Sequence, residues 1–89
     1  MIEIVVDEGF KRSFKKITKN NEELKNKFKS KLEVFVDNPY QHSLKTHKLS
    51  GKLQDYMAFS IDFNVRVLFK FIDSQTAFLI DIGTHDVIY

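Results

Sequence analysis

Residues 57–82 read MAFSIDFNVRVLFKFIDSQTAFLIDI, and this stretch decides the fold. Apolar residues alternate with polar or small ones in three runs, 57–61, 65–71 and 77–82. A period of two is typical of β-strands that bury one face. Short turns separate the runs, so the three strands are expected to form an antiparallel meander. The positions expected to face the core are Met57, Phe59, Ile61, Val65, Val67, Phe69, Phe71, Phe78, Ile80 and Ile82.

The loop between the first two runs predicts how they pair, because a slip of one residue would turn the buried face toward water. A three-residue loop over 62–64 aligns Phe59 with Val67. The same loop places Ser60 beside Arg66. A two-residue loop would set Phe59 against Arg66 and mix the two faces, so we reject it.

A two-residue turn at Asp73-Ser74 is expected to join the second and third strands. The predicted pairs are Val65 with Ile82, Val67 with Ile80, Phe69 with Phe78, Arg66 with Asp81 and Leu68 with Leu79. The open face of the sheet would then carry the row Ser60–Arg66–Asp81. The residues expected beside that row are Ala58, Leu68, Leu79 and Ala77.

Two amphipathic helices are expected before the meander. Residues 1–6 are apolar and β-branched like a first strand, and Asp7 can cap the helix that follows. Asn20 and Glu23 have the spacing of a capping box for a second helix, and Asn38-Pro39 ends it because the residue before proline avoids the α region. The apolar stripes at helical spacing are Phe10, Phe14 and Ile17, then Leu24, Phe28, Leu32, Phe35 and Val36.

The sequence therefore predicts a single α+β domain over residues 1–89, ordered β-α-α-β-β-β. Both helices would pack on one face of an antiparallel meander. Residues 44–49 are expected to form an irregular or edge strand. The other face of the sheet would be available for a ligand.

The composition excludes several classes of protein. The chain has 89 residues, of which 43% are hydrophobic, with nine Phe and no Cys. This apolar content excludes a disordered chain. The lack of Cys excludes a disulfide framework, a zinc–thiolate site and a thiol nucleophile. No run approaches the roughly 18 apolar residues of a membrane span, and acidic residues come too early for a signal peptide. We expect a cytoplasmic protein with no membrane contact.

The net charge of +2 conceals an uneven distribution. Residues 1–54 carry +5 and residues 55–89 carry −3, while the segment 11–31 alone carries +7. Such segregation is typical of a protein with a polyanionic or acidic partner. The alternative is a solvated lysine face that keeps the protein soluble, and charge alone slightly favours this alternative.

Arg66 and His85 are the residues of the predicted sheet region that could carry chemistry. Arg66 could form a cross-strand ion pair with Asp81, or its guanidinium could bind phosphate oxygens. His85 could serve as an acid or base near neutral pH, or it could be an exposed histidine without a role. The three His lack the spacing of a metal site, so we expect no metal and no cofactor.

The order of elements and three short strings together resemble the RelE/ParE superfamily of bacterial toxin–antitoxin toxins, most of all its YafQ-like branch of mRNA interferases. The strings are LKTHKLSG at 44–51, NVRVLFKF at 64–71 and LIDIGTHDVIY at 79–89. The resemblance covers essentially the whole chain. It implies a ribosome-dependent mRNA endoribonuclease that needs no metal, in which the RNA 2′-hydroxyl attacks the adjacent phosphate.

The resemblance also implies roles for individual residues. Arg66 matches a phosphate-stabilising arginine, His85 matches a histidine that would protonate the leaving group, and His47 is the candidate base. Which histidine is the base and which the acid depends on geometry and pKa, and the sequence leaves that open. The residues expected to contact the substrate are Ser60, Asn64, Lys48, Lys52, Lys70 and Tyr89. The implied partners are a cognate antitoxin, the ribosome and mRNA, with operator DNA bound by the antitoxin complex.

Two positions depart from the YafQ-like pattern. Ser60 stands where that branch has a second active-site His, and Asn64 stands near where it has an Asp. Two alternative functions therefore stay open. One is a ParE-like toxin that poisons DNA gyrase without catalysis and needs no His85. The other is a catalytically weakened relative that acts mainly as an antitoxin-binding partner.

Overall fold

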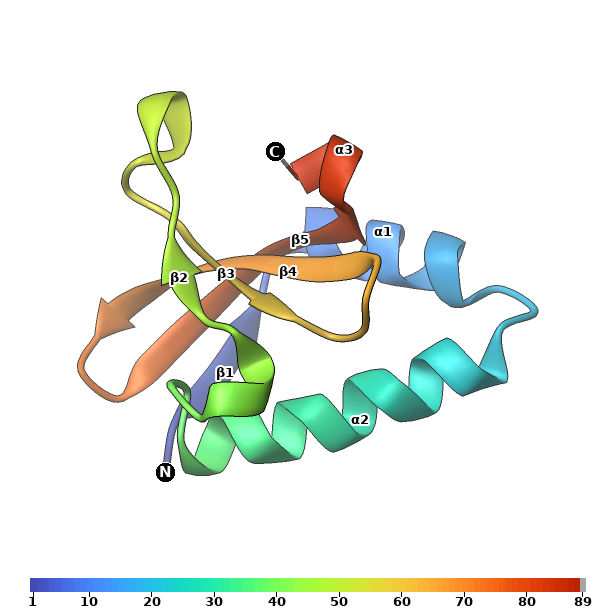
Figure 1. Cartoon of the computed structure of the whole chain (residues 1–89), viewed down its shortest axis with the longest axis horizontal. Coiled ribbons are helices and arrows are strands. Elements are labelled where there is room, and N and C mark those ends of the chain that lie inside the picture. The colour runs from blue at the N-terminus through green and yellow to red at the C-terminus, as the bar shows by residue number, and fades with distance from the viewer. Residues whose placement is uncertain (89) are drawn as a thin grey trace.

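The computed structural model describes residues 1–88, except for the side chain of Val87. Two longer helices and a five-stranded mixed sheet form the body of the molecule (Figure 1). The elements are β1 (Glu3–Val6), α1 (Glu8–Thr18), α2 (Glu22–Asp37), η1 (His42–Leu44), β2 (His47–Lys48), η2 (Gly51–Leu53), β3 (Met57–Ser60), β4 (Val65–Asp73), β5 (Thr76–Thr84) and α3 (His85–Ile88). Across residues 1–88, none of the helices has the length and apolarity that a bilayer crossing requires.

The helices begin and end close to the predicted positions. The Asp7 side chain accepts a hydrogen bond from the Gly9 backbone N–H at 2.8 Å, which caps α1. The cap of α2 is Asn21 and not Asn20, because the Asn21 side chain accepts from the Leu24 N–H at 3.0 Å. Asn20 has a left-handed backbone with φ of 60°, a conformation that Asn tolerates well.

The core lies between α2 and one face of the sheet, with α1 closing one side. Phe35 of α2 is fully buried. Its ring stacks on Phe59 at 4.4 Å and meets Phe69 edge-on at 5.0 Å, measured between ring centroids. Phe14 of α1 packs against this core through Phe28 of α2, and the two ring centroids are 4.7 Å apart. In Figure 1, α2 runs along one side of the sheet and the short α3 lies on the other.

The pairing of β3 with β4 is as predicted. Phe59 pairs with Val67 and Ser60 pairs with Arg66. The turn spans residues 62–64, and beyond it the Ile61 N–H donates to the Val65 carbonyl at 2.9 Å. Ser60 and Arg66 therefore project side by side from the face opposite the Phe59–Phe69 core.

The predicted pairing of β4 with β5 is wrong. The turn is Ser74-Gln75, and Arg66 pairs with Gly83 instead of Asp81. Ile72 is an extra residue in β4 and Ile80 an extra residue in β5, and each such bulge shifts the register by one residue. The pairs seen are Val65 with Thr84, Val67 with Ile82, Leu68 with Asp81 and Phe69 with Leu79.

The bulge at Ile80 also changes which residues of β5 face the core. Ala77 and Leu79 are fully buried in the core cluster, whereas Phe78 and Ile80 are only partly buried and lie outside it. The prediction of Phe78 and Ile80 as core residues is thus wrong, while Ile82 is correct.

Two strands at the edges complete the sheet, in the order β1-β5-β4-β3-β2. The first strand, β1, pairs with β5 in parallel, so the sheet is mixed and not purely antiparallel. The edge strand expected within 44–49 is β2, which has only two residues and pairs with β3 through His47–Ala58 and Lys48–Met57. These edge strands extend the meander on both sides.

Candidate functional site

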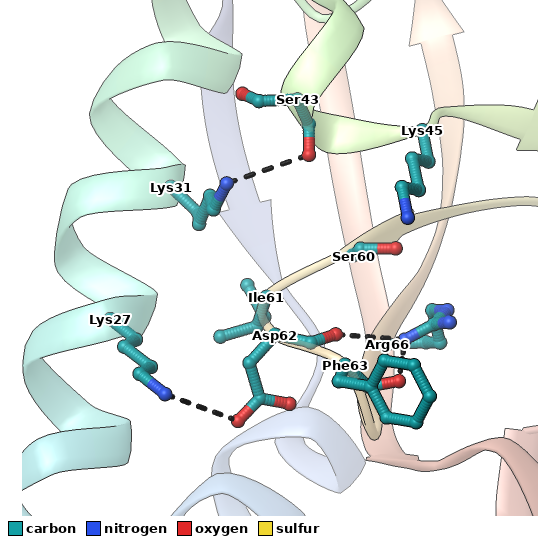
Figure 2. Close-up of a pocket in the computed structure, with 9 residues that line it drawn as sticks. All are labelled: Lys27, Lys31, Ser43, Lys45, Ser60, Ile61, Asp62, Phe63 and Arg66. Atoms are coloured by element: carbon teal, nitrogen blue, oxygen red, sulfur yellow. Dashed lines mark hydrogen bonds and ion pairs between the residues drawn. The ribbon is translucent and has the colours of Figure 1, made fainter.

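The guanidinium of Arg66 is held by backbone carbonyls at the end of the β3–β4 hairpin (Figure 2). Its Nη1 donates to the carbonyl oxygens of Asp62 at 3.0 Å and Phe63 at 3.1 Å. Among residues 1–88, Arg66 forms no ion pair, and Asp81 lies opposite Leu68. Carbonyl groups orient a guanidinium but do not neutralise it. Arg66 therefore keeps its charge for an anion.

The turn that supplies these carbonyls is fixed by the Asp62 side chain. Its Oδ1 accepts from the backbone N–H groups of Asn64 and Val65, both at 2.9 Å. This Asx-type arrangement is typical of tight turns. Lys27 of α2 reaches the other carboxylate oxygen of Asp62 at 3.8 Å. The predicted site residue Asn64 is exposed on this turn.

A pocket of about 450 Å³ opens between α2, η1 and the β3–β4 turn. Its walls carry four cationic side chains, Lys27, Lys31, Lys45 and Arg66, against one carboxylate, Asp62 (Figure 2). The remaining lining residues are Ser43, Ser60, Ile61 and Phe63. The pocket is therefore strongly electropositive, which favours an anionic occupant.

Sequence reasoning missed the three lysines of this pocket. Lys27 and Lys31 are four residues apart on a helix, and this spacing does predict one shared face. Their position opposite Lys45 depends on how α2 packs against the segment after η1. No local pattern contains that information.

Ser60 is the buried polar residue of the site. The residue is 6% exposed, and its Oγ has no hydrogen-bond partner within the described residues. A buried hydroxyl left unpaired costs about 1–3 kcal/mol. Such a group calls for an explanation in a folded protein, and a ligand in the pocket would provide one.

His47 projects from the same face of the sheet as Ser60 and Arg66, because it pairs with Ala58, two residues before Ser60. Its Nδ1 lies 2.8 Å from the Lys45 carbonyl. Since a carbonyl only accepts, Nδ1 carries the hydrogen, and Nε2 is the ring nitrogen with the lone pair in the neutral form. His47 is exposed, so a substrate can reach it.

His85 is exposed at the start of α3, directly after β5. Gly83 of β5 is the cross-strand partner of Arg66, so His85 follows at the same end of the sheet. Gly83 presents no side chain beside Arg66. Gly83 itself is buried.

The other predicted substrate-binding lysines lie elsewhere. Lys48 and Lys70 line a separate pocket of about 320 Å³ beside Tyr56, and the Lys70 Nζ lies 5.7 Å from the Tyr56 ring centroid. Lys70 is four residues along β4 from Arg66, roughly 13 Å away. Lys52 is exposed in η2. Tyr89 lies outside the described residues.

No family model matches the sequence, and no curated protein matches it either. The architecture is that of the RelE/YafQ-like toxins, as solved structures show. YafQ from Escherichia coli strain BL21(DE3) aligns with a TM-score of 0.79 at 16% identity, covering 100% of this chain and 99% of that one. At 23% identity, a metal-bound toxin from Helicobacter pylori aligns with a TM-score of 0.76, covering 100% of both chains.

A third similar chain comes from the structure of the E. coli DinJ–YafQ complex, with a TM-score of 0.79 and 18% identity over 100% of this chain and 99% of that one. At these identities the likeness establishes the fold. The predicted α+β class and the predicted RelE-like architecture are thereby confirmed.

Proposed function

We propose that this protein is the toxin of a type II toxin–antitoxin system and acts as a ribosome-dependent mRNA endoribonuclease. The observation that carries the proposal is the Arg66 guanidinium, which is fixed by the Asp62 and Phe63 carbonyls yet carries an uncompensated charge. It is supported by the fold shared with YafQ. An antitoxin partner is part of the proposal, because a similar structure is a DinJ–YafQ complex.

The proposed reaction is an internal transfer at one RNA phosphate. The Nε2 of His47 takes the proton of the 2′-hydroxyl, and the oxygen attacks the adjacent phosphorus. His85 then donates a proton to the departing 5′-oxygen. The products are a 2′,3′-cyclic phosphate and a 5′-hydroxyl end. General acid–base catalysis of this kind contributes typically 10²–10⁴-fold to a rate.

Arg66 would stabilise the negative charge that grows on the phosphate oxygens in the transition state. A donor held in place before the reaction starts is worth most, because no reorganisation is needed during the step. Ser60 stands where the YafQ-like branch has a histidine, a side chain that could transfer a proton. We therefore propose that Ser60 and Asn64 bind the substrate and that the two histidines carry the proton transfers.

Regulated expression in bacteria tests the proposal. Wild type should stop translation and leave cut mRNA, mapped by primer extension, whereas Arg66→Ala and His85→Ala should do neither. Lys29→Gln on the outer face of α2 is the control that should remain toxic. Toxicity that survives both site variants would contradict the nuclease mechanism. DNA-damage signalling with intact mRNA would instead support gyrase poisoning.

A further inference from the structure

We propose that the pocket between α2, η1 and the β3–β4 turn is a binding subsite for a phosphate group, with the Ser60 hydroxyl as one of its donors and Lys31, Lys45 and Arg66 as its cations. Binding of a phosphate group here does not depend on whether the protein cleaves RNA. Its assignment to a phosphate of an RNA strand rests on the proposed function.

The first argument is the state of the cations. Lys27 is the most compensated of the four, with Glu23 at 3.3 Å and Asp62 at 3.8 Å. Lys31 has only a long contact of 3.5 Å to the Ser43 carbonyl, which carries no net charge. In the described part of the chain, Lys31, Lys45 and Arg66 form no ion pair with a carboxylate. Three uncompensated cations thus line one cavity.

The second argument is independent of charge. Ser60 Oγ is buried without a hydrogen-bond partner among residues 1–88, although it lines the pocket. Figure 2 shows this hydroxyl directed to the side where the Lys45 ammonium and the Arg66 guanidinium lie. A ligand oxygen placed among these three groups would satisfy the hydroxyl and both cations together.

The third argument concerns the kind of anion. A carboxylate presents two oxygens in one plane, so it meets fewer of the donors that surround this pocket. A phosphate group presents several oxygens in a tetrahedral arrangement and pairs well with guanidinium and ammonium donors that approach from different sides. The cavity of about 450 Å³ also has the size of a ligand site. A phosphate group therefore fits the donor set better.

Lys45 is held toward the cavity by an unusual backbone. It ends η1 in the left-handed region with φ of 52°, and its N–H donates to the His42 carbonyl at 3.2 Å. Non-glycine residues rarely adopt this conformation. Replacing Lys45 by Asn, which tolerates it, removes the charge and keeps the turn.

An NMR titration tests the subsite directly. Isotope-labelled protein is titrated with sodium phosphate at constant ionic strength, against sodium chloride as reference. We expect saturable shifts at the amides of Ser43, Ser60 and Asn64, with a Kd of about 1 to 10 mM. Shifts that are absent, or that grow without saturation as they do in chloride, would overturn the proposal.

Matched variants give the titration its specificity. Lys31→Gln combined with Lys45→Asn should weaken phosphate binding about tenfold or more, and Ser60→Ala should weaken it several-fold. Lys29→Gln removes a charge from the same helix outside this pocket and should bind as wild type does. Equal weakening by Lys29→Gln would show non-specific attraction and contradict the subsite.

A second arm identifies the source of the phosphate. A short single-stranded RNA, made uncleavable by 2′-O-methyl groups, is added to the phosphate-saturated protein. Displacement of phosphate from the same amides assigns the subsite to an RNA backbone. Phosphate binding that persists beside bound RNA assigns it to a free phosphate or small phosphate ester and overturns the RNA assignment. Both readings are obtained even if no RNA is cleaved.

Discussion

Ser60 and Arg66 face each other across β3 and β4, and neither has a charged or hydroxyl partner among residues 1–88. The hydroxyl is buried and unpaired among the described residues. In the same part of the chain, only neutral carbonyls fix the guanidinium. A buried hydroxyl left unpaired is costly for the folded protein unless something else binds there. The placement of Ser60 and Arg66 therefore indicates a ligand-binding role and not a contribution to the stability of the fold.

Removing the Ser60 hydroxyl should weaken phosphate binding without lowering the stability of the protein. Because Oγ has no partner to lose among residues 1–88, Ser60→Ala is expected to leave the free energy of unfolding unchanged or raise it by up to about 1 kcal/mol. Urea denaturation measures this change. Ser43→Ala, which removes a hydroxyl bonded to Gln41, is the matched comparison and should not stabilise. A loss above about 1 kcal/mol in Ser60→Ala would mean that the hydroxyl has a structural partner.

Arginine geometry at position 66 should matter beyond its charge. Arg66→Lys keeps the cation but cannot hold two carbonyls and still present a planar fork to phosphate. We expect mRNA cleavage to fall by about 10²-fold or more, as for the loss of a transition-state donor elsewhere. Cleavage is measured with purified protein on programmed ribosomes. Activity within twofold of wild type would show that only the charge counts.

The role of the Asp62 carboxylate can be tested by comparing an alanine variant with an asparagine variant. Asp62→Ala removes the acceptor of two backbone N–H groups and should cost about 1–3 kcal/mol of stability. Asp62→Asn keeps an acceptor oxygen and should lose much less. It also removes the one negative charge of the pocket, so it should bind phosphate more tightly than wild type. Weaker binding in a folded Asp62→Asn protein would contradict the electrostatic reading of the pocket.

The turn between β4 and β5 should give a small dependence of stability on pH. Hydrogen bonds from the Gln75 backbone and the Thr76 side chain lower the pKa of Asp73 below its ordinary value of 3.8. A lowered folded-state pKa means that the stabilisation is complete above the unfolded pKa and disappears as pH falls through the folded one. Asp73→Ala should therefore melt below wild type at pH 7, and the gap should narrow below pH 3.8.

The comparison is thermal melting of both proteins from pH 7 downward. Asp55→Ala, at an exposed carboxylate outside this turn, is the control that should show no such narrowing. A gap between Asp73→Ala and wild type that stays constant at every pH would place the effect in packing and not in the carboxylate.

The β3–β4 pairing could be predicted because its two runs each have one apolar face, so only one loop length matches the faces. The β4–β5 pairing could not. Residues 77–80 are all apolar, and an unbroken apolar run does not indicate which side faces the core. The bulge at Ile80 lies in this apolar run and changes which of its residues face the core. The predicted pairing fails from the Ser74-Gln75 turn onward, and the assumption of strict alternation fails at the Ile80 bulge.

The candidate site was predictable where it lies on strands and not where it depends on packing. Arg66 and Ser60 could be placed together because the hairpin is local. Lys27, Lys31 and Lys45 come from a helix and a loop that meet only in the folded protein. Their contribution to the pocket is a tertiary property, and single-residue patterns do not carry it.

The parallel pairing of β1 with β5 has a consequence for how the chain folds during synthesis. Glu3 pairs with Thr76 and Val6 pairs with Leu79. β1 therefore cannot join the sheet until β5 has left the ribosome. Contacts this far apart in sequence form late and slowly. The Arg66 strand likewise lacks its Gly83 neighbour until then. A nascent chain therefore cannot assemble the site before β5 is available for pairing.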